Sequence, residues 1–313
     1  MSSSLIHFTI NEAQHCGMRL DLYLRRLFPQ ISRNKIQQAI KQGTVQVNHT
    51  NVTPHYFLEL KDEITGELSQ TNIQPQLIPN TQIPIQVHDA EKFFLIIEKP
   101  AGLIVHQSPT HPAPDTLANG LIAHFPECQE IGEDSLRPGI VHRLDKKVSG
   151  LMVIARTEQM WKHLKQQFQE RKVHKEYLAV VHGIFSHKKS VIQLPLMRSQ
   201  DKGHKMAART DQLGKKAETH YEVFKEGRNR SLIRVIIRTG RTHQIRSHLQ
   251  ALGHPIIGDE TYSSRNFKVQ KIGRILLHAT KLTFSDLQGA QRTYESPLPP
   301  SWHTWVKDLR TIT

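Results

Sequence analysis

One uncharged, proline-containing segment limits the fold of this chain more than any other feature. Residues 69–87 read SQTNIQPQLIPNTQIPIQV, with three prolines and no charged residue. Proline fixes φ and lacks the backbone donor, so this composition disfavours a helix or a central strand and favours an extended linker. The segment therefore predicts two domains joined by a linker at residues 71–86. The smaller occupies residues 17–70 after an N-terminal extension at residues 1–16, and the larger occupies residues 87–313.

Positive charge is concentrated in the larger domain. The chain has 42 Lys and Arg against 28 Asp and Glu, a formal net charge of +14, whereas residues 1–84 hold only 7 against 6. Such an excess is typical of proteins that bind a polyanion. No apolar run approaches the roughly 20 residues of a membrane-spanning helix, and the N-terminus lacks the layout of a signal peptide. We therefore expect a cytoplasmic protein with no membrane partner.

The smaller domain opens with two helix patterns. Leu20, Leu24, Leu27 and Phe28 recur at helical spacing and predict one buried face. Ser32 is a suitable N-cap for a second helix, and Gly43 is placed to end that helix in a left-handed conformation. The segments GTVQVN and LELKDEI then predict short strands.

Basic side chains, interleaved with glutamines, occupy the remaining faces of these two helices. The stretch RLDLYLRRLFPQISRNKIQQAIKQGTVQVNHTNV resembles the S4-type RNA-binding domain. That resemblance implies that the helices present their basic faces to structured RNA, whereas an ordinary solvated face is the alternative on charge alone. The predicted RNA-binding residues here are Arg25, Arg26, Arg33, Lys35 and Lys41, and Gln37 is expected to be free beside them.

The larger domain mixes strand and helix patterns without a regular parallel array. Strands are predicted in GLMVIA, KEYLAVVHG, THYEVFKE and SLIRVIIRTG, and Thr157 is placed to cap a helix in EQMWKHLKQQFQER. In RTHQIRSHLQALG a further helix should bury Ile245, Leu249 and Leu252 and end at Gly253. The predicted fold class is α+β, with a small S4-like α/β module joined by a linker to a larger domain built on a mixed, mainly antiparallel sheet.

Several common chemistries lack their sequence signatures. There is no Gly-x-Gly-x-x-Gly after a strand, no GxxxxGK[ST] loop and no HExxH. Cys16 and Cys128 are too far apart for a disulfide framework, a zinc knuckle or the paired cysteines of a zinc base deaminase. His243 and His248 are five residues apart, a spacing that favours hydrogen-bonding or RNA-facing roles over metal binding. We expect no metal, nucleotide or other cofactor.

An ordered set of motifs in the larger domain resembles the RluA family of RNA pseudouridine synthases. RPGIVHRLDKKVSGLMVIART is similar to the family's first catalytic motif, HRLD followed by a short spacer and SGL. RKVHKEYLAVVHG resembles the tyrosine motif, IRTGRTHQIRSHLQALGHPIIGDETY the arginine motif, and ILLHATKLTF with ESPLPP the C-terminal pattern. Together with KPAGLIVH, these motifs cover nearly all of residues 90–300. Val148 stands where the family usually has Thr, which is expected to remove a hydroxyl contact and leave catalysis intact.

The resemblance implies an isomerase that converts uridine in RNA to pseudouridine with one carboxylate, Asp145. The S4-like module suits the RluC-like and RluD-like branch, which modifies large-subunit (23S) ribosomal RNA. Asp145 either attacks C1′ to give a glycosyl ester or removes a proton from C2′ to give a glycal, and both routes stay open. Arg246 is the expected partner of that carboxylate. Tyr177 is similar to the active-site tyrosine that stacks on the base, although a strand tyrosine in the core is its alternative.

A uridine in folded RNA must be flipped out of its stack before it reacts. Arg143 is the predicted wedge or phosphate clamp, and His142 is expected to fix the loop by hydrogen bonds. We expect Asp145 in a basic cleft beside Tyr177 and Arg246 with Arg143 turned away; an exposed pair between Arg143 and Asp145 is the alternative. The predicted RNA-binding residues of this domain are His142, Arg143, Lys146, Lys147, Arg241 and His243.

Two other functions are compatible with parts of the sequence. A noncatalytic RNA-binding or ribosome-assembly factor would explain the charge and the S4-like module, but gives no reason for the HRLD, tyrosine and HQIR motifs to occur together. A glycosylase that releases its base would also use one carboxylate, but usually needs a positioned water and a second acid or base. No coiled-coil seam is present, so a monomer is expected.

Overall fold

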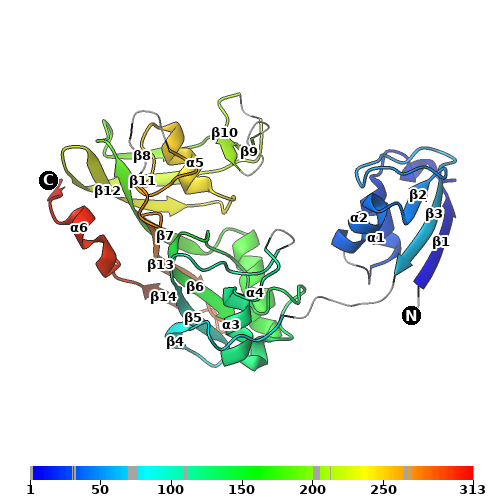
Figure 1. Cartoon of the computed structure of the whole chain (residues 1–313), viewed down its shortest axis with the longest axis horizontal. Helices are drawn as coiled ribbons and strands as arrows, with labels where there is room; N and C mark the ends of the chain where they lie inside the picture. Colours follow the sequence, from blue (N-terminus) through cyan, green and yellow to red (C-terminus); the bar gives the residue numbers. More distant parts are fainter. Residues whose placement is uncertain are drawn as a thin grey trace. The chain divides into compact units, whose positions relative to one another are not determined.

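The computed structural model describes residues 3–29, 31, 33–69, 77–108, 111–199, 205–211, 213–263, 267 and 270–312. The chain divides into two compact units, Met1–Gln74 and Pro75–Thr313, and each has its own apolar core (Figure 1).

The smaller unit packs two helices on a three-stranded antiparallel sheet. Its strands lie in the order β1, β3, β2, and β3 pairs with both neighbours. The elements are β1 (Ser3–Thr9), η1 (Ala13–His15), α1 (Leu20–Leu27), α2 (Arg33–Lys41), β2 (Val45–Val47) and β3 (Glu63–Ser69). Two amphipathic helices over a small sheet bury one continuous core, and this gives a module of this size its stability.

The helices form where their apolar spacing predicts, with one difference at the end of α1. Leu20 and Leu24 are fully buried, whereas Leu27 is 40 % exposed. The helix ends at Leu27, and the next residue, Phe28, packs against the core as the spacing predicts, with its ring 6.0 Å from that of Phe8. The predicted N-cap of the second helix, Ser32, lies outside the described residues.

Three further expectations for the smaller unit differ from the structure. Residues 3–9 of the predicted extension form β1 and pair with β3. In LELKDEI only the last two residues lie in a strand, because Lys61 adopts a left-handed φ of 71° and Asp62 accepts a 2.8 Å hydrogen bond from the Glu59 amide, which closes a turn. Gln37 is not free, since its amide donates to buried Asp21 at 2.5 Å.

The larger unit is built on one mixed sheet, which within the described residues has ten strands in the order β15-β11-β12-β7-β13-β6-β5-β4, with β14 beside β13 and β8 beside β11. All pairings are antiparallel except that of β13 with β6. The strands are β4 (Gln86–Ala90), β5 (Phe94–Lys99), β6 (Ser149–Ala155), β7 (His174–His182), β8 (Lys189–Ile192), β11 (Thr219–Glu226), β12 (Arg230–Ile237), β13 (Leu277–Ser285), β14 (Gln291–Glu295) and β15 (Arg310–Thr311). The mainly antiparallel, α+β prediction is confirmed.

Helices and a small hairpin lie beside the sheet of the larger unit (Figure 1). The hairpin is β9 (Leu196–Arg198) with β10 (Met206–Ala208). The helices are α3 (Leu117–His124), η2 (Pro126–Cys128), α4 (Glu158–Gln169), α5 (Gln244–Ala251), η3 (Pro300–Trp302) and α6 (His303–Val306). α4 contacts β6, and α5 contacts β10 and β11. Of the helices described here, none combines the length and the apolar character needed to cross a membrane.

The predicted caps are partly confirmed. Thr157 accepts a hydrogen bond from the Met160 amide and begins α4. α5 buries Ile245 and Leu249, but Leu252 is 40 % exposed, because the helix ends at Ala251 and Leu252 follows it at the C-cap. Gly253 comes next with φ 82°, as expected of a residue that ends a helix.

The second half of the predicted linker packs on the larger unit. Leu77 is buried in its core, and Ile83 is 8 % exposed. The Asn119 side-chain amide donates to the Ile78 carbonyl at 2.8 Å, and the Asn80 amide donates to the Asn119 carbonyl at 3.1 Å. Residues 70–76 lie outside the described part. Apolar side chains spaced among the prolines therefore attach residues 77–85 to the domain that follows them.

Candidate active site

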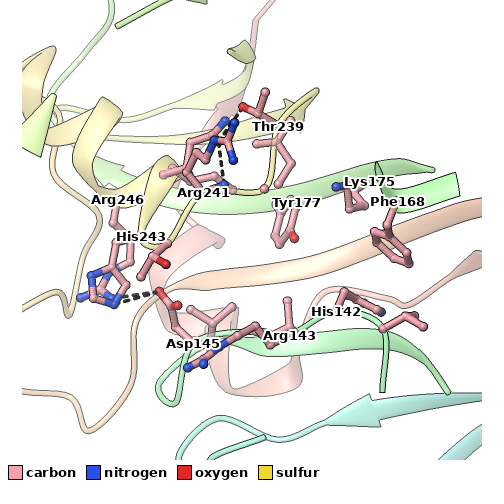
Figure 2. A pocket seen from close by; sticks show the side chains of 18 of the residues that line it. His142, Arg143, Asp145, Phe168, Lys175, Tyr177, Thr239, Arg241, His243 and Arg246 are labelled. Atoms are coloured by element: carbon pink, nitrogen blue, oxygen red, sulfur yellow. Dashed lines mark hydrogen bonds and ion pairs between the residues drawn. The ribbon is translucent and has the colours of Figure 1, made fainter. Parts of the chain in front are cut away.

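A cavity of about 510 Å³ lies where the loop before β6, the strand β7 and the segment between β12 and α5 come together (Figure 2). Of the predicted catalytic residues, Asp145, Tyr177 and Arg246 all line it. Of the predicted RNA-binding residues, His142, Arg143, Arg241 and His243 also line it. The structure thus brings together residues that are widely separated in the sequence.

The loop that carries Asp145 is held from behind by a buried lysine. Lys99 is fully buried, and its Nζ donates to the carbonyls of Pro100 at 2.7 Å, Leu103 at 2.9 Å and Lys146 at 3.3 Å. Burial lowers its pKa to about 7, although the charge of Asp145 opposes the shift. Because one of the three carbonyls belongs to the residue after Asp145, the Lys99 ammonium fixes the turn on which the carboxylate sits.

Ser149 and Gly150, which follow Asp145 in the same motif, each have a different structural role. Ser149 Oγ lies 2.9 Å from His278 Nδ1 and accepts a 2.7 Å hydrogen bond from Arg274 Nη2. Gly150 has φ 125°, and a Cβ built on it would lie 2.3 Å from the Ala279 carbonyl oxygen. Only glycine permits this approach, which joins β6 to β13 in the one parallel pairing and places the Asp145 loop at the cavity.

Asp145 is paired with Arg246, from α5. Arg246 Nη1 donates to Asp145 Oδ2 at 2.9 Å, and the guanidinium is itself held by Asp259, which accepts from Nε at 2.6 Å and from Nη2 at 2.9 Å. Arg246 is 6 % exposed and Asp259 is 3 % exposed. Burial lowers the pKa of Arg246, but the hydrogen bonds and charges of Asp259 and Asp145 more than offset this and hold its pKa above the usual value. The arginine therefore presents a permanent positive charge to the carboxylate.

His243 lies beside this pair. It precedes α5 in a left-handed conformation with φ 55°, and its Nε2 is 3.9 Å from Asp145 Oδ2. Its Nδ1 is 3.1 Å from the Tyr262 hydroxyl. Burial lowers the pKa of His243, Asp145 opposes that shift and Arg246 adds to it, so the ring is mainly neutral at pH 7. The structure places His243 at the carboxylate itself.

Tyr177 projects from β7 into the cavity (Figure 2). Its side chain is 7 % exposed, and its hydroxyl has no hydrogen-bond partner among the residues the structure describes. Burial, together with the negative charge of Asp145, raises the pKa of Tyr177 above its usual value. The phenol therefore stays protonated at neutral pH, and its ring forms an aromatic wall that a planar base could contact.

His142 has the loop-fixing position that was expected. Its Nε2 accepts a hydrogen bond from the Val153 amide at 3.1 Å, and its ring stacks on Phe168 at 4.7 Å. Burial, with a contribution from the charge of Lys175, lowers the pKa of His142 to about 3. The ring is therefore neutral, and its position fits support of the loop better than contact with a phosphate.

Arg143 is exposed at the edge of the cavity, and its described contact is with His106, whose Nε2 is 3.4 Å from Nη1. Within the described part of the chain, no ion pair joins Arg143 to Asp145. His106 is 4 % exposed, and burial, with Arg137 and Arg143 nearby, lowers its pKa to about 4. Among the described residues, the exposed arginine therefore does not form the ion pair with Asp145 that was the alternative.

The remaining predicted RNA-binding residues of the larger unit differ in where they lie and in what they contact. Lys146 is exposed and outside the cavity lining, and Lys147 pairs with Glu260 at 2.8 Å. Arg241 Nε donates to the Lys216 carbonyl at 3.3 Å.

In the smaller unit, Arg25 does not extend freely, because Nη1 donates to the carbonyls of Pro29 and Ile31. Arg26 and Lys41 are exposed, and Lys35 is partly buried. The side chain of Arg33 lies outside the described part.

Several site residues were absent from the sequence-based set. Asp259 is in the quoted GDETY stretch, and Lys99 is in KPAGLIVH, so each was within a motif but had no assigned role. Lys175 lines the cavity two residues before Tyr177. Its position in KEY was the available signal, because alternate residues of a strand face the same side. The described residues contain no group of three or more His, Cys, Asp or Glu side chains placed to hold a metal ion.

Known proteins match both units. The family model of RNA pseudouridylate synthase matches residues 93–251, and that of the S4 domain matches residues 18–64. A Bacillus subtilis protein named uncharacterized RNA pseudouridine synthase YlyB is 34 % identical over 97 % of this chain and 98 % of its own length. Ribosomal large subunit pseudouridine synthase D of Nitrosomonas europaea is 35 % identical over 95 % of this chain and 86 % of its own. The structure of human RNA pseudouridylate synthase domain containing 1 superposes with a TM-score of 0.60 at 25 % identity, covering 75 % of this chain and 91 % of that one. The resemblance in the motifs is thereby confirmed, and the chain belongs to the RNA pseudouridine synthase family of isomerases, with an S4 domain before its synthase domain.

Proposed function

We propose that this enzyme converts uridine to pseudouridine in large-subunit ribosomal RNA, with Asp145 as the reacting carboxylate. The observation that carries the proposal is the 2.9 Å contact between Arg246 and Asp145 at the wall of a 510 Å³ cavity. A permanent cation stabilises a carboxylate that is only 22 % exposed, and the cavity is large enough for one nucleoside. The relatives named ribosomal large subunit pseudouridine synthase D support the choice of RNA.

In the proposed reaction the bond between N1 of uracil and C1′ of ribose breaks, and the electron pair leaves with the base. Asp145 either bonds to C1′ or takes a proton from C2′; both routes place negative charge beside the developing oxocarbenium ion. The base then turns and C5 bonds to C1′, while the Asp145–C1′ bond breaks or the C2′ proton returns from Asp145; the C5 proton is then released and N1 takes up a proton. Tyr177 contributes an aromatic face that can hold the base while it turns.

The target uridine reaches this cavity by flipping out of the RNA stack. Arg143 is exposed at the edge of the cavity, so it can fill the vacated position or bind a neighbouring phosphate. In the smaller unit, exposed Arg26 and Lys41 are the residues that we propose for contact with folded RNA, as in an S4 domain.

The test uses the whole chain and large-subunit rRNA fragments tritiated at C5 of uridine. Tritium release without free uracil is the expected result, and Asp145→Asn is expected to abolish release without loss of RNA affinity. An Asp145→Asn protein as active as wild type would contradict the assignment of the carboxylate. Accumulation of free uracil would instead identify a glycosylase, and RNA binding without either product would identify a noncatalytic binding factor.

A further inference from the structure

A lysine also enters the same cavity, from β7. Lys175 precedes Tyr177 by two residues, and both side chains line the cavity. Lys175 lies opposite Leu282 of β13 in the sheet, and its Nζ is 5.4 Å from the centre of the Phe168 ring. In the view of Figure 2 Tyr177 is drawn between Lys175 and Asp145, and all three residues line the cavity. A planar base that contacts Tyr177 would therefore share the cavity with the carboxylate and the ammonium.

The ammonium of Lys175 has no anionic partner in the part of the chain that the structure describes, and its ring contact there is with Phe168. No carboxylate there lies within 4.0 Å of Nζ, and no acceptor bonds to it, whereas Lys172 close by in the sequence pairs with Glu170 at 2.7 Å. Nζ faces the Phe168 ring, and a Cβ built on Gly240 would lie 3.9 Å from it. Burial lowers the pKa of Lys175 to about 8. A cation held among apolar groups without an anion is costly, so its position points to a partner that arrives with the substrate.

The chemistry of that partner follows from the reaction. Heterolysis of the C1′–N1 bond sends both electrons to the base, and the detached uracil is then an anion with charge shared among N1, O2 and O4. An ammonium in a cavity that partly shields it from solvent stabilises such an anion more than the same group would in water. Phosphates of the RNA stay outside, where exposed Arg143 and Arg171 are placed to meet them.

We infer that Lys175 binds a carbonyl oxygen of the target uracil and stabilises the uracil anion while it is detached from the ribose. No proton is transferred in this step: the ammonium donates a hydrogen bond to O2 or O4 from cleavage of C1′–N1 until C5 bonds to C1′. The inference rests on the proposed function and adds the group that recognises the base. Lys175 would thus act on the leaving base, whereas Asp145 acts on the sugar.

The test compares two RNA substrates whose target bases differ in basicity. If Lys175 acts directly on the leaving base, the effect of removing this lysine depends on how basic that base is. Fluorine at C5 withdraws electrons and makes the uracil anion a better leaving group that needs less stabilisation. Lys175→Met should slow single-turnover consumption of uridine in rRNA by about 100-fold, the usual effect of removing one donor to a developing anion. On RNA with 5-fluorouridine at the target the defect should be at least about tenfold smaller, measured as loss of 5-fluorouridine after nuclease digestion.

Three further variants complete the experiment. Lys175→Arg keeps the charge and should restore part of the rate, and Lys162→Met, which removes a lysine 71 % exposed on α4, should retain wild-type rate and affinity. RNA affinity is measured for each variant, and thermal unfolding verifies that Lys175→Met is folded. Equal defects on the two substrates, a defect confined to RNA affinity, or a fully active Lys175→Met would each overturn the inference. Because Asp145→Asn tests the proposed function separately, an inactive Asp145→Asn with an active Lys175→Met would reject only the role of Lys175.

Discussion

Asp259 holds Arg246 by two hydrogen bonds, of 2.6 and 2.9 Å, and leaves the remaining Nη1 group of the guanidinium directed at Asp145. Asp259 is fixed in turn, because its Oδ1 also accepts hydrogen bonds from the amides of Thr261 and Tyr262, both at 3.0 Å. Asp145, the carboxylate that we propose to react, is thus oriented by an arginine that a second, buried carboxylate orients. Such a chain of contacts fixes both the charge and the direction of the group at the cavity.

This chain predicts the behaviour of Asp259→Asn. The amide keeps the shape of the side chain but removes a charge that is paired with buried Arg246, and breaking one partner of a buried pair is costly. We expect a loss of about 2 to 4 kcal/mol in the free energy of unfolding, measured in urea, and about 100-fold slower single turnover. Asp308→Asn is the matched control, since Asp308 pairs with Arg230 but is 61 % exposed. A destabilised but fully active Asp259→Asn would show that orientation of Arg246 does not matter to the reaction.

The pH dependence of single turnover should reveal Lys175. Its pKa is lowered to about 8, so the ammonium is present below pH 8 and is lost as the pH rises through that value. Two other groups that line the same cavity do not titrate there, because burial lowers the pKa of His142 to about 3 and raises the pKa of Tyr177.

The wild-type rate should therefore fall above about pH 8, and in Lys175→Arg this alkaline decrease should move to higher pH, because the guanidinium keeps its charge. A decrease that stays near pH 8 in Lys175→Arg would exclude Lys175 as its origin and point to Lys99 behind the loop, whose pKa is about 7.

Gly150→Ala should be among the most damaging small substitutions. The added Cβ would lie 2.3 Å from the backbone of Ala279, and φ at this position is 125°. Both effects oppose the parallel pairing of β6 with β13, so we expect a loss of about 2 to 4 kcal/mol, read from urea unfolding. Gly289→Ala is the control: φ is 82° there and a Cβ would meet nothing within 4 Å, so only the backbone cost of about 1 to 2 kcal/mol is expected. Equal costs at the two positions would refute the steric explanation.

The two leucines near the end of α5 should differ strongly. Leu249 is fully buried, so Leu249→Ala should cost about 2 to 5 kcal/mol in the free energy of unfolding. Leu252 is 40 % exposed, and Leu252→Ala should change that free energy by less than about 0.5 kcal/mol. Thermal or urea unfolding of the two variants measures the difference. A large loss in the free energy of unfolding of Leu252→Ala would instead support the sequence-based prediction that Leu252 belongs to the buried face of α5.

Local sequence patterns identified most of the elements around the site. Thr157 at the start of α4 and the apolar spacing of α5 could be predicted because capping and helical periodicity depend on neighbours along the chain. The ends of the helices were less predictable. Leu252 satisfies the apolar periodicity of α5 but lies just after its last residue, and Leu27 satisfies the periodicity of α1 but is its last residue. The residues in the quoted motifs were also identifiable, since their order along the chain is itself the signal.

The sequence by itself determined the two-unit organisation, the α+β class and the family, because each is encoded in composition, periodicity or motif order. Only the tertiary structure decided which groups meet. Arg246 reaches Asp145 across 101 residues, and Asp259 supports it. Lys175 enters the cavity beside Tyr177 because both lie on β7, between β12 and β13, and no carboxylate of the described residues pairs with it. These contacts depend on the order and register of strands that are distant in the sequence, and no local pattern encodes which strands will pair.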